Sequence, residues 1–177
     1  MNRHAGIINC LLLFACLCQH SAQAQEWPDT FGFGETASAD EIAAWDIDVK
    51  PDGQGLPTGS GTVDEGAALY AANCAVCHGK TGVEGPNDRL VVNSADESFP
   101  DAGDVNAWQH RTIGNYWPYA TTLFDYIRRS MPMNIPGSLE ANEVYALTAY
   151  LLYLNHIVAA DTLLDAANLA EVVMPAR

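Results

Sequence analysis

The sequence is poor in basic residues. Its 177 residues include eight lysines and arginines, with Lys50 and Lys80 the only lysines, against 22 aspartates and glutamates. The formal charge of -14 argues against nucleic acid or an anionic membrane surface as a partner, because both repel an acidic protein. A basic patch on a partner protein would attract it, although the same charge also keeps an exported protein soluble.

The sequence also lacks an apolar run long enough to cross a membrane. Its longest such run, Ile7–Cys18, has about a dozen residues, whereas a spanning helix needs roughly 20. A short basic start precedes the run, and small residues follow it at Ser21–Ala24 in the pattern that signal peptidase accepts. We predict a signal peptide over residues 1–24, a periplasmic location and no membrane span after cleavage. A lipoprotein signal ending at Cys16 is the rival interpretation.

Cysteine is scarce in the predicted mature chain. Three of the five cysteines lie in the predicted signal peptide, which leaves Cys74 and Cys77. They belong to the sequence Cys-Ala-Val-Cys-His, which ends at His78 and has the C-x-x-C-H spacing of a heme-attachment motif. The two sulfurs can bond one edge of a heme while the neighbouring imidazole binds its iron. We therefore predict one covalent heme c.

The motif has three alternative interpretations: a structural disulfide, a zinc half-site and a thioredoxin-type redox pair. A zinc site needs further Cys or His ligands, and only His110 and His156 remain in the mature chain. A thioredoxin motif belongs to a βαβ unit, and the sequence has no alternation of strands and helices.

Helical periodicity is present on both sides of the motif. Residues 64–73 and 141–154 carry apolar side chains at helical spacing. Together with the C-x-x-C-H motif, these segments resemble class I cytochromes c. The resemblance implies an all-α fold, a small helical bundle around one covalent heme. It also implies that Gly66 and Tyr70 of the first helix cross the last helix at Tyr150.

The same resemblance implies further site residues. It places the sixth ligand at Met131, in the Met-Pro pair after a helix at 121–129, with Met133 as the alternative. Met174, His110 and His156 are weaker candidates. It also implies that Pro86 accepts a hydrogen bond from His78. Three residues are expected at the heme edge and propionates: Arg111, Tyr116 and Trp117. A methionine in the sixth position argues against an independent heme enzyme.

Longer stretches carry a narrower resemblance. They are similar to the cytochrome subunit of bacterial sulfane or sulfite dehydrogenases, and comprise residues 44–53, 55–57, 112–129, 143–150 and 173–175. This resemblance implies an electron-transfer protein, not an enzyme by itself. It would accept electrons from a molybdenum-cofactor subunit and pass them singly to a downstream cytochrome c or oxidase. One alternative is a free-standing periplasmic carrier with several donors; another is a self-contained heme enzyme acting on a small sulfur compound.

These features predict four parts of the chain: a signal peptide (1–24), an N-terminal extension (25–63), a cytochrome c domain (64–157) and a helical tail (158–177). Within the extension, Ser38 and Glu41 form a capping-box pattern for a helix to about Trp45. Residues 51–61 are too rich in glycine and proline for regular structure. The aromatic residues of the extension suit either packing on its own domain or a partner-binding arm.

Overall fold

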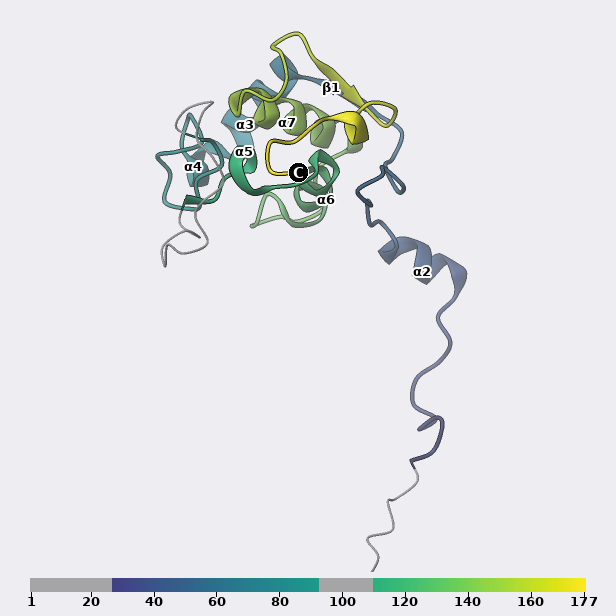
Figure 1. The fold of residues 1–177 in the computed structure, drawn as a ribbon. Coiled ribbons are helices and arrows are strands. Elements are labelled where there is room, and N and C mark those ends of the chain that lie inside the picture. The colour runs from purple at the N-terminus through teal and green to yellow at the C-terminus, as the bar shows by residue number, and fades with distance from the viewer. Residues whose placement is uncertain (1–26, 93–109) are drawn as a thin grey trace, which may run out of the picture. The chain divides into compact units, whose positions relative to one another are not determined.

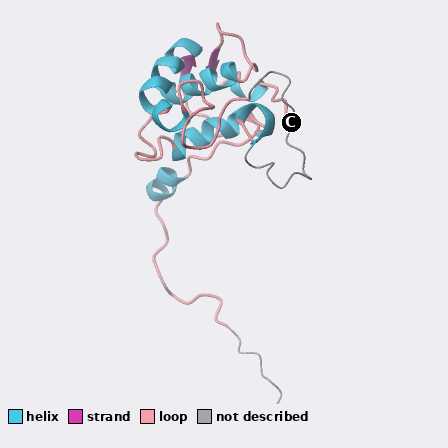
Figure 2. Cartoon of the chain, turned by 90° about the vertical axis from the view of Figure 1, so that its left-hand side faces the viewer, coloured by secondary structure: helices cyan, strands magenta, loops and turns pink. Residues whose placement is uncertain are grey.

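The structure is a computed structural model that describes residues 27–92 and 110–177. The predicted signal peptide lies outside the described residues. The chain divides into two units, one ending at Glu41 and one beginning at Ile42. Most of the regular structure in the second unit is helical, and its described strands form one short pair (Figure 2). The predicted all-α class is confirmed.

Helix α2 (Ala39–Trp45) begins at the predicted capping box. The backbone N–H and the hydroxyl of Ser38 each donate to the Glu41 carboxylate at 2.8 Å, and the Glu41 N–H donates back to the Ser38 hydroxyl at 3.3 Å. This pair stabilises the first turn. Every residue from 27 to 46 is exposed, so the helix is held by local bonds and not by a buried face.

Helix α3 (Val63–Asn73) starts within one residue of its predicted position. Thr62 and Glu65 form a capping box there: the Glu65 N–H donates to the Thr62 hydroxyl, and the Thr62 N–H donates to the Glu65 carboxylate. These bonds satisfy backbone groups that the first turn of a helix leaves without partners. The cap fixes where α3 begins, and thereby where the C-x-x-C-H motif follows at its other end.

Helix α7 (Ala141–Leu154) has the predicted bounds and crosses α3 closely. A Cβ added to Gly66 would lie 2.0 Å from the Ala146 carbonyl oxygen and 2.7 Å from the Cβ of Tyr150. The rings of Tyr70 and Tyr150 pack with centroids 5.4 Å apart. The predicted crossing is therefore confirmed, and a side chain at position 66 would prevent it.

Helix α7 is also the centre of the hydrophobic core. It packs against α3, α6 (Ala120–Ser130) and both strands, β1 (Ser60–Thr62) and β2 (Leu163–Asp165) (Figure 1). Its buried residues include Val144, Tyr145, Leu147, Ala149, Leu151 and Leu152. Helix α6 has the predicted position to within one residue at each end. The described part of the second unit also has two shorter α-helices, α4 (Ala75–His78) and α5 (Ile113–Tyr116).

The C-terminal tail is not a helix, and this prediction is wrong. It forms β2, which pairs antiparallel with β1, and a single 3-10 turn, η2 (Leu169–Glu171). Its buried residues are Leu164, Leu169 and Met174, and a spacing of five does not keep side chains on one helical face. The Asp165 carboxylate accepts backbone N–H groups just after the strand and turns the chain.

The segments flanking the predicted cytochrome domain share its core. Val49 of the extension and three residues of the tail belong to the same buried cluster as α3, α6 and α7. In the described ranges, 27–92 and 110–177, no helix combines the length and apolar character needed to cross a membrane.

Candidate functional site

The C-x-x-C-H motif folds as one helical turn at the end of α3. The carbonyl oxygen of Cys74 accepts the N–H of Cys77 at 3.1 Å and that of His78 at 3.0 Å. The buried hydroxyl of Tyr70 donates to the carbonyl of Gly79 at 2.9 Å, directly after the motif. Helix α3 thus anchors both ends of the turn, because Tyr70 and Cys74 lie on consecutive turns.

The imidazole of His78 is oriented by a backbone carbonyl. Its Nδ1 lies 2.8 Å from the carbonyl oxygen of Asp88, so an Nδ1–H donated there leaves Nε2 available to a metal. The acceptor was predicted at Pro86, and that prediction is wrong. The reason is the path of the loop: the Asn87 N–H donates to the Cys77 carbonyl at 3.0 Å and carries the next carbonyl to the ring. Pro86 nevertheless lies at the edge of a cavity beside the motif.

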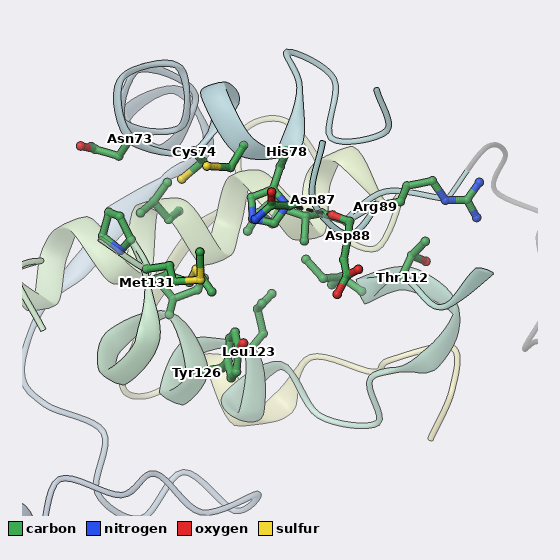
Figure 3. A pocket seen from close by; sticks show the side chains of 18 of the residues that line it. Asn73, Cys74, His78, Asn87, Asp88, Arg89, Thr112, Leu123, Tyr126 and Met131 are labelled. Carbon is green, nitrogen blue, oxygen red and sulfur yellow. Dashed lines mark hydrogen bonds between the residues drawn. The ribbon is translucent and has the colours of Figure 1, made fainter. Parts of the chain in front are cut away.

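A cavity of about 930 Å³ opens beside the motif. His78 projects into it from α4, whereas Leu123, Tyr126 and the Met131 sulfur approach from α6 and its C-terminal end (Figure 3). Further apolar walls come from Leu90, Ile113, Ile127, Leu139, Leu147 and Leu151. The space is therefore mostly apolar, and the His78 imidazole and the Met131 sulfur enter it from different sides.

The two candidate methionines differ in burial. Met131 is the C-cap of α6; its N–H donates to the Ile127 carbonyl at 3.0 Å, and its side chain is partly buried. Met133 also borders the cavity but is 67% exposed. Met174 is buried in the core and does not line the cavity, and neither do His110 and His156. Burial favours Met131, although the ligand stays a prediction.

The three residues predicted for the heme edge all line the cavity. The guanidinium of Arg111 lies 4.4 Å from the ring centroid of Tyr116, and its Nη1 is 3.4 Å from the phenol oxygen. Trp117 meets the ring of Tyr126 edge-on, with centroids 5.5 Å apart. These residues form an aromatic rim with one cation, a suitable setting for carboxylates of a bound group.

The donor set fits a covalent heme. Two thiols one helical turn apart, an imidazole with a free nitrogen and a thioether converge on an apolar space of the size that encloses a large ligand. The other interpretations lack support. Cys74 and Cys77 do not form a disulfide, and among the described residues no three His, Cys, Asp or Glu side chains gather at a metal site. A βαβ unit is likewise absent from the described part of the fold.

Burial also shapes the chemistry of the first cysteine. It raises the pKa of the Cys74 thiol to about 11, and the nearby Cys77 adds to the effect. A raised pKa means that the thiol holds its proton more tightly and is a weaker nucleophile than an exposed cysteine.

A helical fold with this motif and cavity defines a c-type cytochrome. The chain belongs to the cytochrome c family: residues 61–151 match the family described as "Cytochrome C oxidase, cbb3-type, subunit III". Its heme c is covalently bound. The fold is also similar to a chain in the crystal structure of the sulfane dehydrogenase SoxCD from Paracoccus pantotrophus. That match has 44% identity and a TM-score of 0.68, and covers 82% of this chain and 69% of the other. No curated protein matches the chain.

One residue that organises the site was missed by the sequence analysis. The side chain of Asn155, buried at the end of α7, accepts the N–H groups of Val92 and Gly114 at 3.1 and 3.0 Å. It also donates to the carbonyls of Leu90 and Leu151 at 3.2 and 2.8 Å. Asn155 thereby joins two walls of the cavity. An asparagine just after a helix normally indicates only a cap, so nothing in the sequence distinguished it.

Proposed function

We propose that this protein is the electron-transfer subunit of a molybdenum-dependent sulfane or sulfite dehydrogenase. It would accept electrons from the molybdenum subunit and pass them singly to a downstream cytochrome c or oxidase. The observation that carries the proposal is the 44% identity to a chain of sulfane dehydrogenase SoxCD over 82% of this sequence. An isolated heme motif would not suggest this partner, since c-type cytochromes serve many donors.

The residues of the cavity have distinct roles in this proposal. Cys74 and Cys77 attach the heme, His78 and Met131 ligate its iron, and Met133 is the alternative sixth ligand. Pro86, Arg111, Tyr116 and Trp117 contact its edge. When bound, the heme supplies one-electron transfer between ferrous and ferric iron. The chain orients His78 through Asp88 and keeps water from the iron with apolar walls.

The proposed compartment is the periplasm, reached by cleavage of residues 1–24. Support comes from the sequence of that segment, a short apolar run followed by small residues. The domain boundaries proposed from the sequence are kept, with one refinement. Residues 47–63 contact the cytochrome domain, for example where β1 packs against α7 and where the Val49 N–H donates to Asp125 of α6, so only residues 25–46 are proposed as the partner-binding arm.

The exposed apolar side chains of this arm support its docking role. Residues 27–46 bury no side chain, although they include Trp27, Phe31, Phe33, Ile42 and Trp45. The 27–46 segment also has five acidic residues and no lysine or arginine. Exposed aromatics of this size are typical anchors of protein interfaces. A complementary surface would be an apolar groove with a basic rim on the molybdenum subunit.

The test is metal analysis of the native protein, purified gently at low salt from its own cells. We expect molybdenum in fixed proportion to heme iron. Removal of the partner should remove both the molybdenum and the oxidation of sulfite or thiosulfate. Heme iron without molybdenum at both low and high salt would contradict the proposal and favour a free-standing carrier. Oxidation of a sulfur compound by the isolated heme protein would instead favour an enzyme.

A further inference from the structure

Helix α6 has two functional faces. Leu123, Tyr126 and Ile127 lie on the face that lines the cavity, and Met131 follows at the end of the helix. The other face carries polar groups, among them Asp125 and Arg128. Because a helix is rigid over three turns, whatever holds the polar face also sets the position of the Met131 backbone.

A single segment of the extension holds that polar face. Residues 47–59, here called the strap, run between α2 and β1 (Figure 1). The Arg128 guanidinium donates to the carbonyl of Ile47 at 3.1 Å. Two residues on, the Val49 N–H donates to the carboxylate of Asp125 at 3.0 Å, in a buried setting. The strap then crosses to α7, where the Tyr145 hydroxyl donates to the Pro57 carbonyl at 2.9 Å.

Asp125 is the central contact. It is only 8% exposed, and its carboxylate accepts several hydrogen bonds. One comes from the Val49 N–H, and the others come from Arg129, whose Nε lies 3.1 Å from both oxygens and whose Nη2 also donates. A buried carboxylate is retained only when its hydrogen bonds are satisfied. The ion pair of Arg129 with Asp48 of the strap spans 3.6 Å with both side chains largely exposed, and adds little.

The strap has its own fixed shape at this contact. The Lys50 N–H donates to the Gln54 carbonyl at 2.9 Å and closes a tight turn. Gly55, with a φ of +94°, returns so near the start of the strap that a Cβ there would lie 2.0 Å from the Asp48 carbonyl oxygen. A turn of this kind requires glycine. The segment bonded to Asp125 is thus a turn of fixed shape, so the hydrogen bond holds α6 at a fixed place relative to this turn.

We propose that Asp125 is a positioning residue for the sixth ligand: by clamping Val49 of the strap to the outer face of α6, it holds Met131 at the iron. The inference rests on the proposed ligation by Met131, and extends it to a residue that does not line the cavity. It gives the strap a role beyond stability, since the same segment continues into the proposed partner-binding arm.

The experiment uses the holoprotein with three variants. Asp125→Ala removes the clamp, and Asp125→Asn retains one oxygen for the Val49 N–H. Tyr145→Phe, the matched control, removes the hydrogen bond between the strap and α7 and leaves the contacts of the strap with α6 unchanged. Two properties are measured in the ferric protein without denaturant: the long-wavelength charge-transfer band of a thioether–iron bond, and the affinity for added imidazole, which displaces a sixth ligand. Free energies of unfolding are measured in parallel.

We expect Asp125→Ala to weaken the band and to bind imidazole about tenfold more tightly, as loss of a hydrogen bond to a charged group suggests. Asp125→Asn should have a band intensity and an imidazole affinity between those of Asp125→Ala and the wild type. It replaces the alanine variant in the comparison if that variant does not fold. Tyr145→Phe should match the wild type whatever its loss of stability. Equal imidazole affinity in all four proteins, or an affinity that follows stability alone, would overturn the positioning role. Absence of the band from the wild type would overturn the ligand assignment itself, and with it this inference.

Discussion

The backbone of Gly66 lies directly against the backbone of Ala146. A Cβ at position 66 would stand 2.0 Å from the Ala146 carbonyl oxygen and 2.6 Å from its carbon. Backbone atoms at the middle of a packed helix cannot move aside as a flexible side chain can. The contact therefore requires glycine, although glycine within a helix is itself unfavourable by about 1 kcal/mol relative to alanine.

Replacing this glycine should separate α3 from α7. We expect Gly66→Ala to lower the free energy of unfolding by about 1–3 kcal/mol, because the clash outweighs the better helix propensity of alanine. Denaturant unfolding of the holoprotein measures the change. Ala71→Ser, at an exposed position of the same helix, is the control and should have little effect. A more stable Gly66→Ala protein would show that the crossing can widen without cost.

The choice between the two methionines can be decided by a matched pair. Met131 is partly buried at the end of α6, whereas Met133 is 67% exposed. Met131→Ala should abolish the charge-transfer band of the ferric holoprotein and lower its reduction potential, because a thioether ligand favours ferrous iron. Met133→Ala should leave both unchanged. The reverse pattern would assign the ligand to Met133 and show that burial of the side chain does not identify the ligand.

The features predicted best from the sequence are those determined by near neighbours. The Ser38–Glu41 capping box set the start of α2, and helical spacing set the ends of α7. The Gly66–Tyr150 crossing was also correct, because a family resemblance pointed to it. In the first two cases the deciding residues lie within or next to one helix, whereas the crossing joins α3 and α7 and was reached only through the resemblance.

The features missed depend on the path of the chain. A backbone carbonyl, that of Asp88, orients His78, and no residue type indicates which carbonyl a loop will present. Asp125 and Val49 lie 76 residues apart, and an Asp-x-x-x-Arg spacing in a helix first suggests a surface ion pair. The tail was wrongly predicted to be helical, because its leucines include exposed Leu163 as well as buried Leu164. Burial distinguishes these neighbours, and sequence alone does not.

The loop after the heme motif should make stability sensitive to acid. The Thr81 hydroxyl donates to the Glu84 carboxylate at 2.6 Å, and backbone N–H groups of Thr81 and Val83 donate as well. Chiefly through the Thr81 hydroxyl, these bonds lower the pKa of Glu84 to about 2 from 4.5. A lowered pKa in the fold means a contribution to stability that is full above the unfolded value and is lost as pH falls toward the folded one.

Glu84→Gln should therefore be less stable than the wild type at about pH 6, with the gap closing between about pH 4.5 and about pH 2. Thermal unfolding of the two holoproteins across this range measures the gap. Thr81→Val removes the main donor and should reproduce part of the effect. A gap that stays constant down to the lowest pH would mean that the carboxylate charge does not stabilise the loop.

The proposed docking arm predicts a loss of binding without a loss of stability. Trp45 is 86% exposed and Phe33 is 89% exposed, so alanine at either position removes no buried packing, and Phe33 loses only its exposed stacking on Phe31. We expect Trp45→Ala and Phe33→Ala to leave the unfolding transition and the heme spectrum unchanged. Each should weaken association with the molybdenum subunit by about tenfold or more, as truncation of an aromatic interface anchor typically does. Sedimentation or calorimetric titration of the purified partners measures this.

The matched control for these variants is Val173→Ala. Val173 is apolar and 74% exposed, but lies in the tail outside the arm, so its truncation should not affect association. Arm variants that bind like the wild type, together with a Val173 variant that binds weakly, would move the interface from the arm to the tail. Because none of the three changes touches the cavity, a change in affinity reports on docking and not on the heme.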